Sequence, residues 1–189
     1  MPATCKHLRP IGLCLRCAKV PNILDVSDPR LVPVLSSGKT QHVHWILQLA
    51  FQDLNAAFVA DTGLSSLKVG SGHRLKRWPG RTAYNAELLR RYRHRCPPGS
   101  SNAVIIAYGK RRLAYNSLHY TGCAIDLRCH GLTINSSRNE QMKKLEVYKW
   151  LKSNAKPPWI NYVYECWHWE YFIPPSVWAL MGPDTAVMI

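Results

Sequence analysis

The chain has 189 residues, which is enough for one domain with a hydrophobic core and a small appendage. Its 25 Lys and Arg residues against 11 Asp and Glu give a formal net charge of +14, which predicts an anionic partner: nucleic acid, a membrane surface or an anionic cell wall. No apolar run approaches the ~18 residues of a membrane-spanning helix, so no such helix is expected.

The first 38 residues are expected to form an N-terminal arm, and residues 39–189 the main domain. The arm contains Cys5, His7, Cys14 and Cys17 in the spacing C-x-H-x6-C-x2-C, and four such side chains can close around a structural zinc ion. The alternative is an unstructured tail in which the cysteines are incidental. Residues 21–38 are rich in Pro, Asp and Ser, which is typical of a linker or an extended arm.

Apolar residues recur at helical spacing from residue 39 to 60, and Gly63 is placed to end that helix. Two further helices are predicted at residues 82–95 and 139–155. Short apolar segments predict strands at residues 67–72, 102–108, 122–129 and 162–172. The sequence therefore predicts an α+β fold, in which a small antiparallel sheet is packed with about three helices.

Two segments contain side chains that suit metal chemistry. His119 and Asp126 lie seven positions apart, and Glu165 comes three residues before His168. A catalytic zinc ion usually takes three nitrogen or oxygen ligands and leaves the fourth position to water, whose proton a nearby carboxylate can accept. A lone His or Asp is more often a packing or turn residue, but together they predict a mononuclear zinc hydrolase. Its ligands would be His119, Asp126 and His168, with Glu165 as the general base.

Five residues of the first segment fit the pattern S-x-H-x-x-G-x-A-x-D, and the second segment supplies E-x-W-H about forty residues later. The residues of the first pattern are Ser117, His119, Gly122, Ala124 and Asp126. Over about residues 40 to 175 the chain therefore resembles the zinc D-Ala-D-Ala carboxypeptidases and L-Ala-D-Glu endopeptidases of bacterial cell walls. These enzymes share a fold with lysostaphin-type peptidases and the hedgehog signalling domain.

The resemblance implies roles for further residues. Arg74, in the segment LKVGSGHRL, corresponds to an Arg that projects into the active site and stabilises an oxyanion. His73 and Leu75 replace the Tyr and Ser that usually flank it, and a surface Arg in a basic stretch is the alternative. Ser117 is expected to order the ligand loop, and Trp167 to pack in the core or line the substrate cleft. The sheet is expected to carry the zinc site.

The activity that the resemblance implies is zinc-dependent hydrolysis of a peptide bond in the peptidoglycan stem. The bond is the terminal D-Ala-D-Ala bond for a carboxypeptidase, or the L-Ala-D-Glu bond or a cross-link for an endopeptidase. The alternative is a non-catalytic, zinc-containing protein of the same fold that binds cell wall or nucleic acid. The zinc motif favours the wall over nucleic acid as the anionic partner, and a monomer is expected.

Seven cysteines, an odd number, and an N-terminus without the apolar segment of a signal peptide indicate a chain made in the reducing cytoplasm. A wall peptidase made there must be released to reach its substrate. The sequence therefore predicts a phage endolysin that acts during lysis, or a lytic component of a virion.

Overall fold

The computed structural model describes residues 24–75, 78, 80–113, 115, 117–128, 139–162 and 165–173. The chain divides into two compact units. The first is formed by Met1–Leu75 together with Leu118–Ile189, and the second by Lys76–Ser117. In the described parts of the chain, no helix has the length and apolar character needed to cross a membrane.

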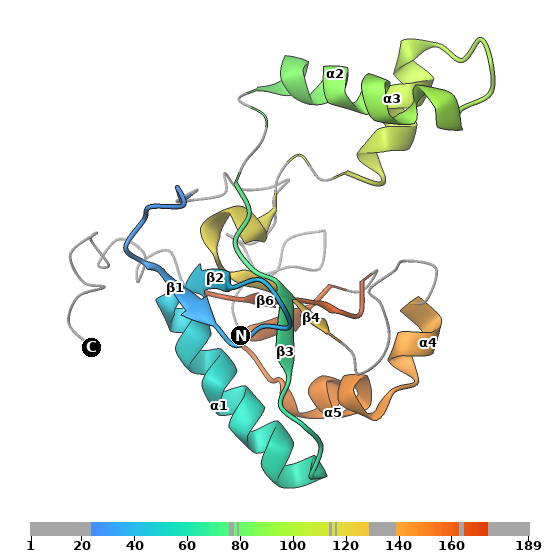
Figure 1. Cartoon of the computed structure of the whole chain (residues 1–189). Helices are drawn as coiled ribbons and strands as arrows, with labels where there is room; N and C mark the ends of the chain where they lie inside the picture. The colour runs from blue at the N-terminus through green and yellow to red at the C-terminus, as the bar shows by residue number, and fades with distance from the viewer. Residues whose placement is uncertain are drawn as a thin grey trace. The chain divides into compact units, whose positions relative to one another are not determined.

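The first unit is built on a four-stranded antiparallel sheet with the strand order β3-β4-β6-β5. Strands β3, β4 and β6 of this sheet are labelled in Figure 1. Its strands are β3 (Lys68–Ser71), β4 (Ala124–Arg128), β5 (Trp159–Asn161) and β6 (His168–Tyr171). A separate antiparallel hairpin is formed by β1 (Leu31–Val34) and β2 (Gln41–His44). With four helices of seven or more residues in the described chain, the α+β prediction is confirmed.

Helix α1 (Trp45–Thr62) follows β2 directly and buries one face of the predicted helical pattern, at Leu47, Phe51, Leu54 and Phe58. It starts later than predicted, because residues 41–44 pair with β1 as a strand. The His44 ring accepts a hydrogen bond from the backbone N–H of Ile46 at 3.3 Å and so caps the helix. Gly63 ends the helix, as predicted, with a left-handed φ of 65°.

The alternation of side chains along β4 separates the core from the opposite face of the sheet. Ile125 and Leu127 are fully buried in the core with residues of α1 and of α5 (Glu146–Asn154). Asp126 lies between them and therefore points to the other face. The predicted helix 139–155 is divided into α4 (Asn139–Lys143) and α5, because Leu145 has an extended backbone conformation.

The N-terminal arm is described only in part. Cys5, His7, Cys14 and Cys17 lie outside the described residues. Within residues 24–38, Leu24 is buried, and β1 pairs with β2 along its whole length. The domain boundary at residue 38 stays a prediction, but this part of the predicted linker contains a regular strand.

The second unit is helical, and one prediction for it is wrong. It contains α2 (Arg81–Tyr92), the 3-10 turn η1 (Arg93–Arg95) and α3 (Asn102–Lys110), the last at a segment predicted to be a strand. A short apolar run rich in Val and Ile fits either structure. Here Ser101 caps the helix by accepting from the Val104 N–H, and Ile105 is buried against α2 residues.

Candidate metal centre

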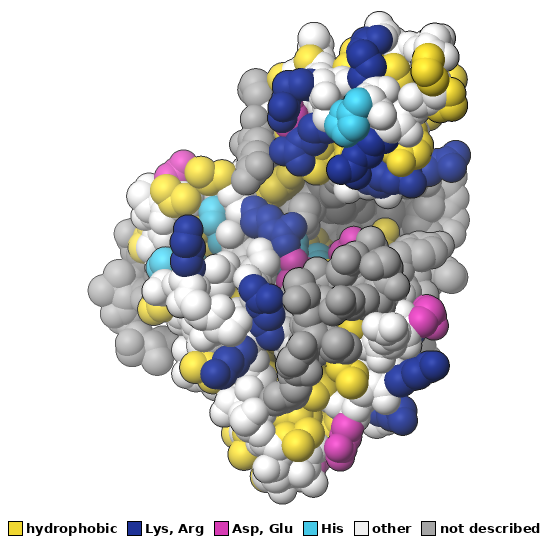
Figure 2. Space-filling view, turned by 45° about the vertical axis from the view of Figure 1, so that its right-hand side comes forward, with side chains coloured by type: hydrophobic (Ala, Val, Ile, Leu, Met, Phe, Trp, Pro, Cys, Tyr) yellow, Lys and Arg dark blue, Asp and Glu magenta, His cyan; other side chains and the backbone are white. Residues whose placement is uncertain are grey.

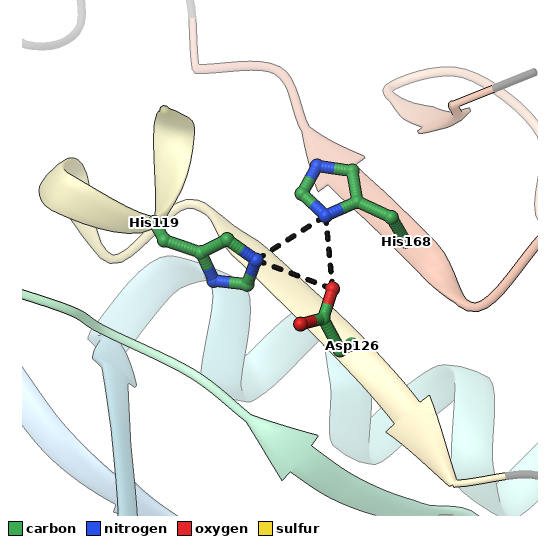
Figure 3. Close-up of side chains that lie close together, drawn as sticks. All are labelled: His119, Asp126 and His168. Atoms are coloured by element: carbon green, nitrogen blue, oxygen red, sulfur yellow. Dashed lines mark hydrogen bonds and ion pairs between the residues drawn. The ribbon is translucent and has the colours of Figure 1, made fainter. Parts of the chain in front are cut away.

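Three side chains of the first unit meet in one buried cluster (Figure 3). His119 Nε2 and His168 Nδ1 lie 3.2 Å apart. Asp126 Oδ1 lies 3.2 Å from the first nitrogen and 2.9 Å from the second. All three residues are at most 7% exposed. The structure thus brings together the three residues that were predicted as zinc ligands.

The sheet explains why these residues converge. Asp126 on β4 is the direct cross-strand partner of His168, the first residue of β6, so both side chains lie on the same face. His119 comes from the 3-10 turn η2 (Leu118–Thr121), which leads into β4. Gly122 joins the two with a positive φ of 71°, and a Cβ there would lie 2.6 Å from the backbone nitrogen of His44. The positive φ and the contact with that backbone together require glycine at this position.

Backbone groups near the end of β3 fix His119. Its Nδ1 lies 2.6 Å from the carbonyl oxygen of Gly72, to which it donates. The backbone N–H of Arg74 donates to the carbonyl of His119 at 3.1 Å. Because Nδ1 carries the proton, Nε2 is left with its lone pair facing Asp126 and His168.

Glu170 is a site residue that the sequence analysis missed. Its Oε1 lies 3.1 Å from Nε2 of His168, and its side chain is 3% exposed. A carboxylate in this position accepts the Nε2 proton of the ring and leaves Nδ1 free to bind a metal. The signal was present in the sequence, since residues i and i+2 of a predicted strand share a face.

Arg74 lies beside the cluster, where its guanidinium forms an ion pair with Oδ2 of Asp126, and its role in stabilising an oxyanion stays a prediction. Its Nε also donates to the hydroxyl of Ser71 at 2.8 Å, and Ser71 lies opposite Asp126 in the sheet. Arg74 therefore holds the carboxylate oxygen that does not face the histidines. About half of the Arg74 side chain remains exposed.

Glu165 lies just before β6, where a tight turn brings it next to the metal ligands. Its backbone N–H donates to the carbonyl of Tyr162 at 3.0 Å, and its own carbonyl accepts from the His168 N–H at 2.9 Å. On a regular strand Glu165 and His168 would face opposite sides. The predicted strand 162–172 is shorter in the structure, because β6 begins only at His168, and Glu165 therefore lies in the turn before it.

The cluster is electrostatically coupled. Burial would raise the pKa of Asp126, but the two histidine rings beside its carboxylate outweigh this effect and hold that pKa far below its usual range. Burial would lower the pKa of His168, but its bonds to Asp126 and Glu170 raise it to about 9. Burial lowers the pKa of His119, while burial raises that of Glu165. Asp126 is therefore anionic, and Glu165 is a stronger base than an exposed carboxylate.

The two remaining predicted site residues have different surroundings. Trp167 is 6% exposed and packs with Met142 and Cys166, which fits the core alternative. Ser117 is the last residue of the second unit, directly before η2, and its role in ordering the ligand loop stays a prediction.

The residues present fit a catalytic zinc ion. Two imidazole nitrogens and one carboxylate oxygen match the usual ligand set of three, and their ligand atoms lie within 4.8 Å of one another. Each histidine is bonded through its other nitrogen to an oxygen, from Gly72 for His119 and from Glu170 for His168. Such outer contacts are typical of metal-binding histidines.

The chain matches no protein-family model, and no curated protein matches it. Solved structures do match, among them the following two. A zinc complex of a mutant of VanY, the vancomycin-resistance D,D-pentapeptidase of a VanB-type cassette, has a TM-score of 0.50 and 22% identity, over 87% of this chain and 85% of that one. VanYB in complex with D-alanine-D-alanine has a TM-score of 0.53 and 22% identity, over 85% of each chain. The chain therefore has the fold of the D,D-peptidase VanY, with a buried His-Asp-His metal site in its first unit.

Proposed function

We propose that this protein is a zinc-dependent peptidase that cleaves the D-Ala-D-Ala bond at the end of a peptidoglycan stem peptide. The main support for this proposal is the buried cluster of His119, Asp126 and His168. Arg74, which follows β3, and Glu165, which precedes β6, belong to segments next to the same sheet. The fold match supports the substrate, since the VanYB structure is a complex with D-alanine-D-alanine.

When bound by the three ligands, zinc would lower the pKa of a water molecule and polarise the scissile carbonyl. Glu165 would accept a proton from that water and return it to the leaving amine. Its raised pKa suits both transfers. The Arg74 side chain is about half exposed beside Asp126, and its guanidinium can stabilise negative charge that develops on the carbonyl oxygen.

We further propose that the enzyme acts in lysis, as a phage endolysin or a virion component released from the cytoplasm onto the wall. Cys96, Cys123 and Cys166 are free thiols among the described residues, which supports folding in a reducing compartment. In this context the L-Ala-D-Glu bond or a cross-link is the alternative point of cleavage.

The experiment is mass spectrometry of purified peptidoglycan fragments after incubation with the protein, with and without a chelator. Glu165→Gln and Glu165→Ala are tested beside the wild type, and bound zinc is measured in each. We expect loss of one terminal D-Ala, abolished by the chelator. Both variants are expected to keep zinc and lose activity by at least a hundredfold, which is the range of general-base catalysis.

The outcomes separate the candidate functions. Chelator-sensitive cleavage within the stem or at a cross-link would assign an endopeptidase. Full activity of Glu165→Ala would exclude this residue as the base. An absence of chelator-sensitive cleavage from every fragment would favour the non-catalytic binding protein.

A further inference from the structure

The second unit has a composition unlike that of the rest of the chain. Residues 76–117 contain ten Lys or Arg residues and one acidic residue, Glu87, so that a net charge of +9 out of the chain's +14 resides in 42 residues. We propose that the α2–α3 unit is a docking surface for a phosphodiester-linked anionic polymer of the cell wall. This inference rests on the proposed wall function, and it adds that the second unit attaches the peptidase to the cell wall.

Most of the Lys and Arg residues that the structure describes in this unit are exposed, and most of those are not paired with a carboxylate. Glu87 is bound by Arg90 at 2.7 Å and by Arg91 at 2.5 Å. Arg93, Arg95, Lys110 and Arg111 are exposed, and among the described residues no acidic group pairs with them. Figure 2 shows Lys and Arg side chains spread over the visible face of this unit. Such an excess of one sign attracts a polyanion and is weakened by salt.

Tyrosine rings hold several of these guanidinium groups in place. Arg112 lies over the ring of Tyr108 at 3.6 Å from its centroid, and Arg95 lies 5.8 Å from that of Tyr92. The two tyrosines contact each other edge to face, with 5.8 Å between ring centroids. Stacking orders a guanidinium without neutralising it, so the N–H groups at its edge stay available to phosphate oxygens.

The same contacts favour a polymer without bases over nucleic acid. Proteins that bind single strands present free aromatic faces on which bases stack. Here Tyr92 is buried, and Arg112 and Arg81 cover the rings of Tyr108 and Tyr115. The unit thus offers cations to phosphates, and the rings that stacking would need are occupied by its own arginines.

The test is co-sedimentation of the full chain with purified walls that carry a polyol-phosphate polymer. Glu165→Gln is used throughout, so that the walls are not digested. Half of the walls are stripped of phosphodiester-linked polymer with hydrofluoric acid. We expect binding to intact walls that weakens steeply between 50 and 300 mM salt, and at least tenfold weaker binding to stripped walls.

The test variant replaces Arg93, Arg95, Lys110 and Arg111 by Gln. Its matched control replaces four exposed lysines of the first unit by Gln, at Lys144, Lys149, Lys152 and Lys156. Both variants lose four charges. We expect at least a tenfold loss of wall binding for the first and less than a twofold loss for the second. A version with Lys at all four positions of the second unit should keep most of the binding.

Equal losses in the two Gln variants, or equal binding to stripped and intact walls, would overturn the proposal. Tighter binding to a DNA fragment, or to phosphatidylglycerol vesicles, would overturn it in favour of nucleic acid or membrane. Hydrolysis of a short soluble peptide ending in D-Ala-D-Ala, measured without the Glu165 change, keeps the two proposals apart. The second-unit variant should retain that activity, whereas its absence from the wild type would refute the proposed peptidase instead.

Discussion

Oxygen acceptors hold both imidazole rings of the site by the nitrogens that face away from the ligand cluster. For His119 the acceptor is the Gly72 carbonyl, and for His168 it is Glu170. The two acceptors differ in one respect: a backbone carbonyl survives any substitution, whereas the Glu170 carboxylate does not. The orientation of His168 therefore depends on one side chain that does not itself bind the metal.

Replacing Glu170 by Ala is expected to weaken zinc binding by about 10- to 100-fold, because His168 loses the acceptor that selects its ring orientation. Glu170→Gln keeps an acceptor oxygen and should lose less. Zinc affinity is measured by competition with a chromophoric chelator, and Glu146→Gln, an exposed position on α5, is the control. Unchanged affinity together with a lower melting temperature of the zinc-free protein would mean that Glu170 serves packing alone.

The ligands could be predicted from the sequence because each lies in a short segment with its own spacing. Glu170 was missed because residue type alone does not distinguish an outer carboxylate from a surface one, although the predicted strand 162–172 puts it on the same face as His168. Arg74 was predicted at the site, but its pairing with Asp126 depends on the alignment of β3 with β4. The register of that pairing shifts between Val69 and Ser71, and no pattern in the sequence predicts this shift.

At the scale of single elements, α1 depends on an unusual cap. His44 is fully buried, and its ring accepts from the Ile46 N–H only while Nδ1 is unprotonated. Burial lowers the pKa of His44 from 6.5 to about 4. The folded state thus favours neutral His44. The contribution of His44 to the free energy of unfolding is therefore fully present above pH 6.5, and it is lost as the pH falls from 6.5 through 4.

We therefore expect the free energy of unfolding to fall below pH 6.5, with a contribution from His44 of about 3 kcal/mol once the ring is protonated. His44→Asn keeps a side chain that can cap the helix but does not titrate in this range. It should flatten the pH dependence of unfolding by urea between pH 6.5 and 4. His42→Asn, an exposed neighbour on β2, should leave the dependence as it is. The same slope in both variants would contradict this role.

Helices α2 and α3 approach each other closely at Gly109. A Cβ there would lie 2.8 Å from Cδ2 of Tyr92 and 2.9 Å from Cδ2 of Leu88, both buried side chains. Gly109→Ala is expected to destabilise the second unit by about 1–3 kcal/mol through overpacking. Hydrogen exchange of α2 and α3 measures it. Gly80→Ser is the control, since a Cβ there meets nothing within 4 Å and Ser can cap α2, and it should change the stability by about 0.5 kcal/mol or less.

The strand predicted at residues 102–108 is helix α3 in the structure, and the difference has a physical reason. Helix α1 was recognisable because four buried positions repeat along 18 residues. Helix α3 has nine residues, and its Val and Ile residues favour a strand when considered alone. What makes it a helix is the Ser101 cap and the contact with α2, and the second of these is not local in the sequence.

For the whole molecule, the division into two units predicts that metal binding stabilises only one of them. His119, Asp126 and His168 all belong to the first unit. Zinc at a hundred times its dissociation constant should add about 2.7 kcal/mol to the stability of that unit. Hydrogen exchange with and without chelator should show the change in β4 and β6, while α2 and α3 keep their protection. Equal changes in both units would indicate that they unfold together.

The total charge of the chain was known from composition, but its concentration in one unit was not recognised from the sequence. The basic stretches at residues 88–95 and 110–112 lie on either side of an apolar segment. They become parts of one unit only because α2 and α3 pack together as a pair. The fold class, in contrast, follows from the order of the elements, which local patterns mostly predicted.

The hydrogen bond between the Arg74 N–H and the His119 carbonyl has a consequence for the engineering of this protein. The chain leaves the first unit just after Arg74 and re-enters it just before His119. The hydrogen bond between these two residues therefore holds the two ends of the intervening stretch close together. A peptide with its ends so close can be exchanged as a cassette. Residues 76–117 are thus a natural place to graft another module, which would redirect the catalytic unit to a different surface.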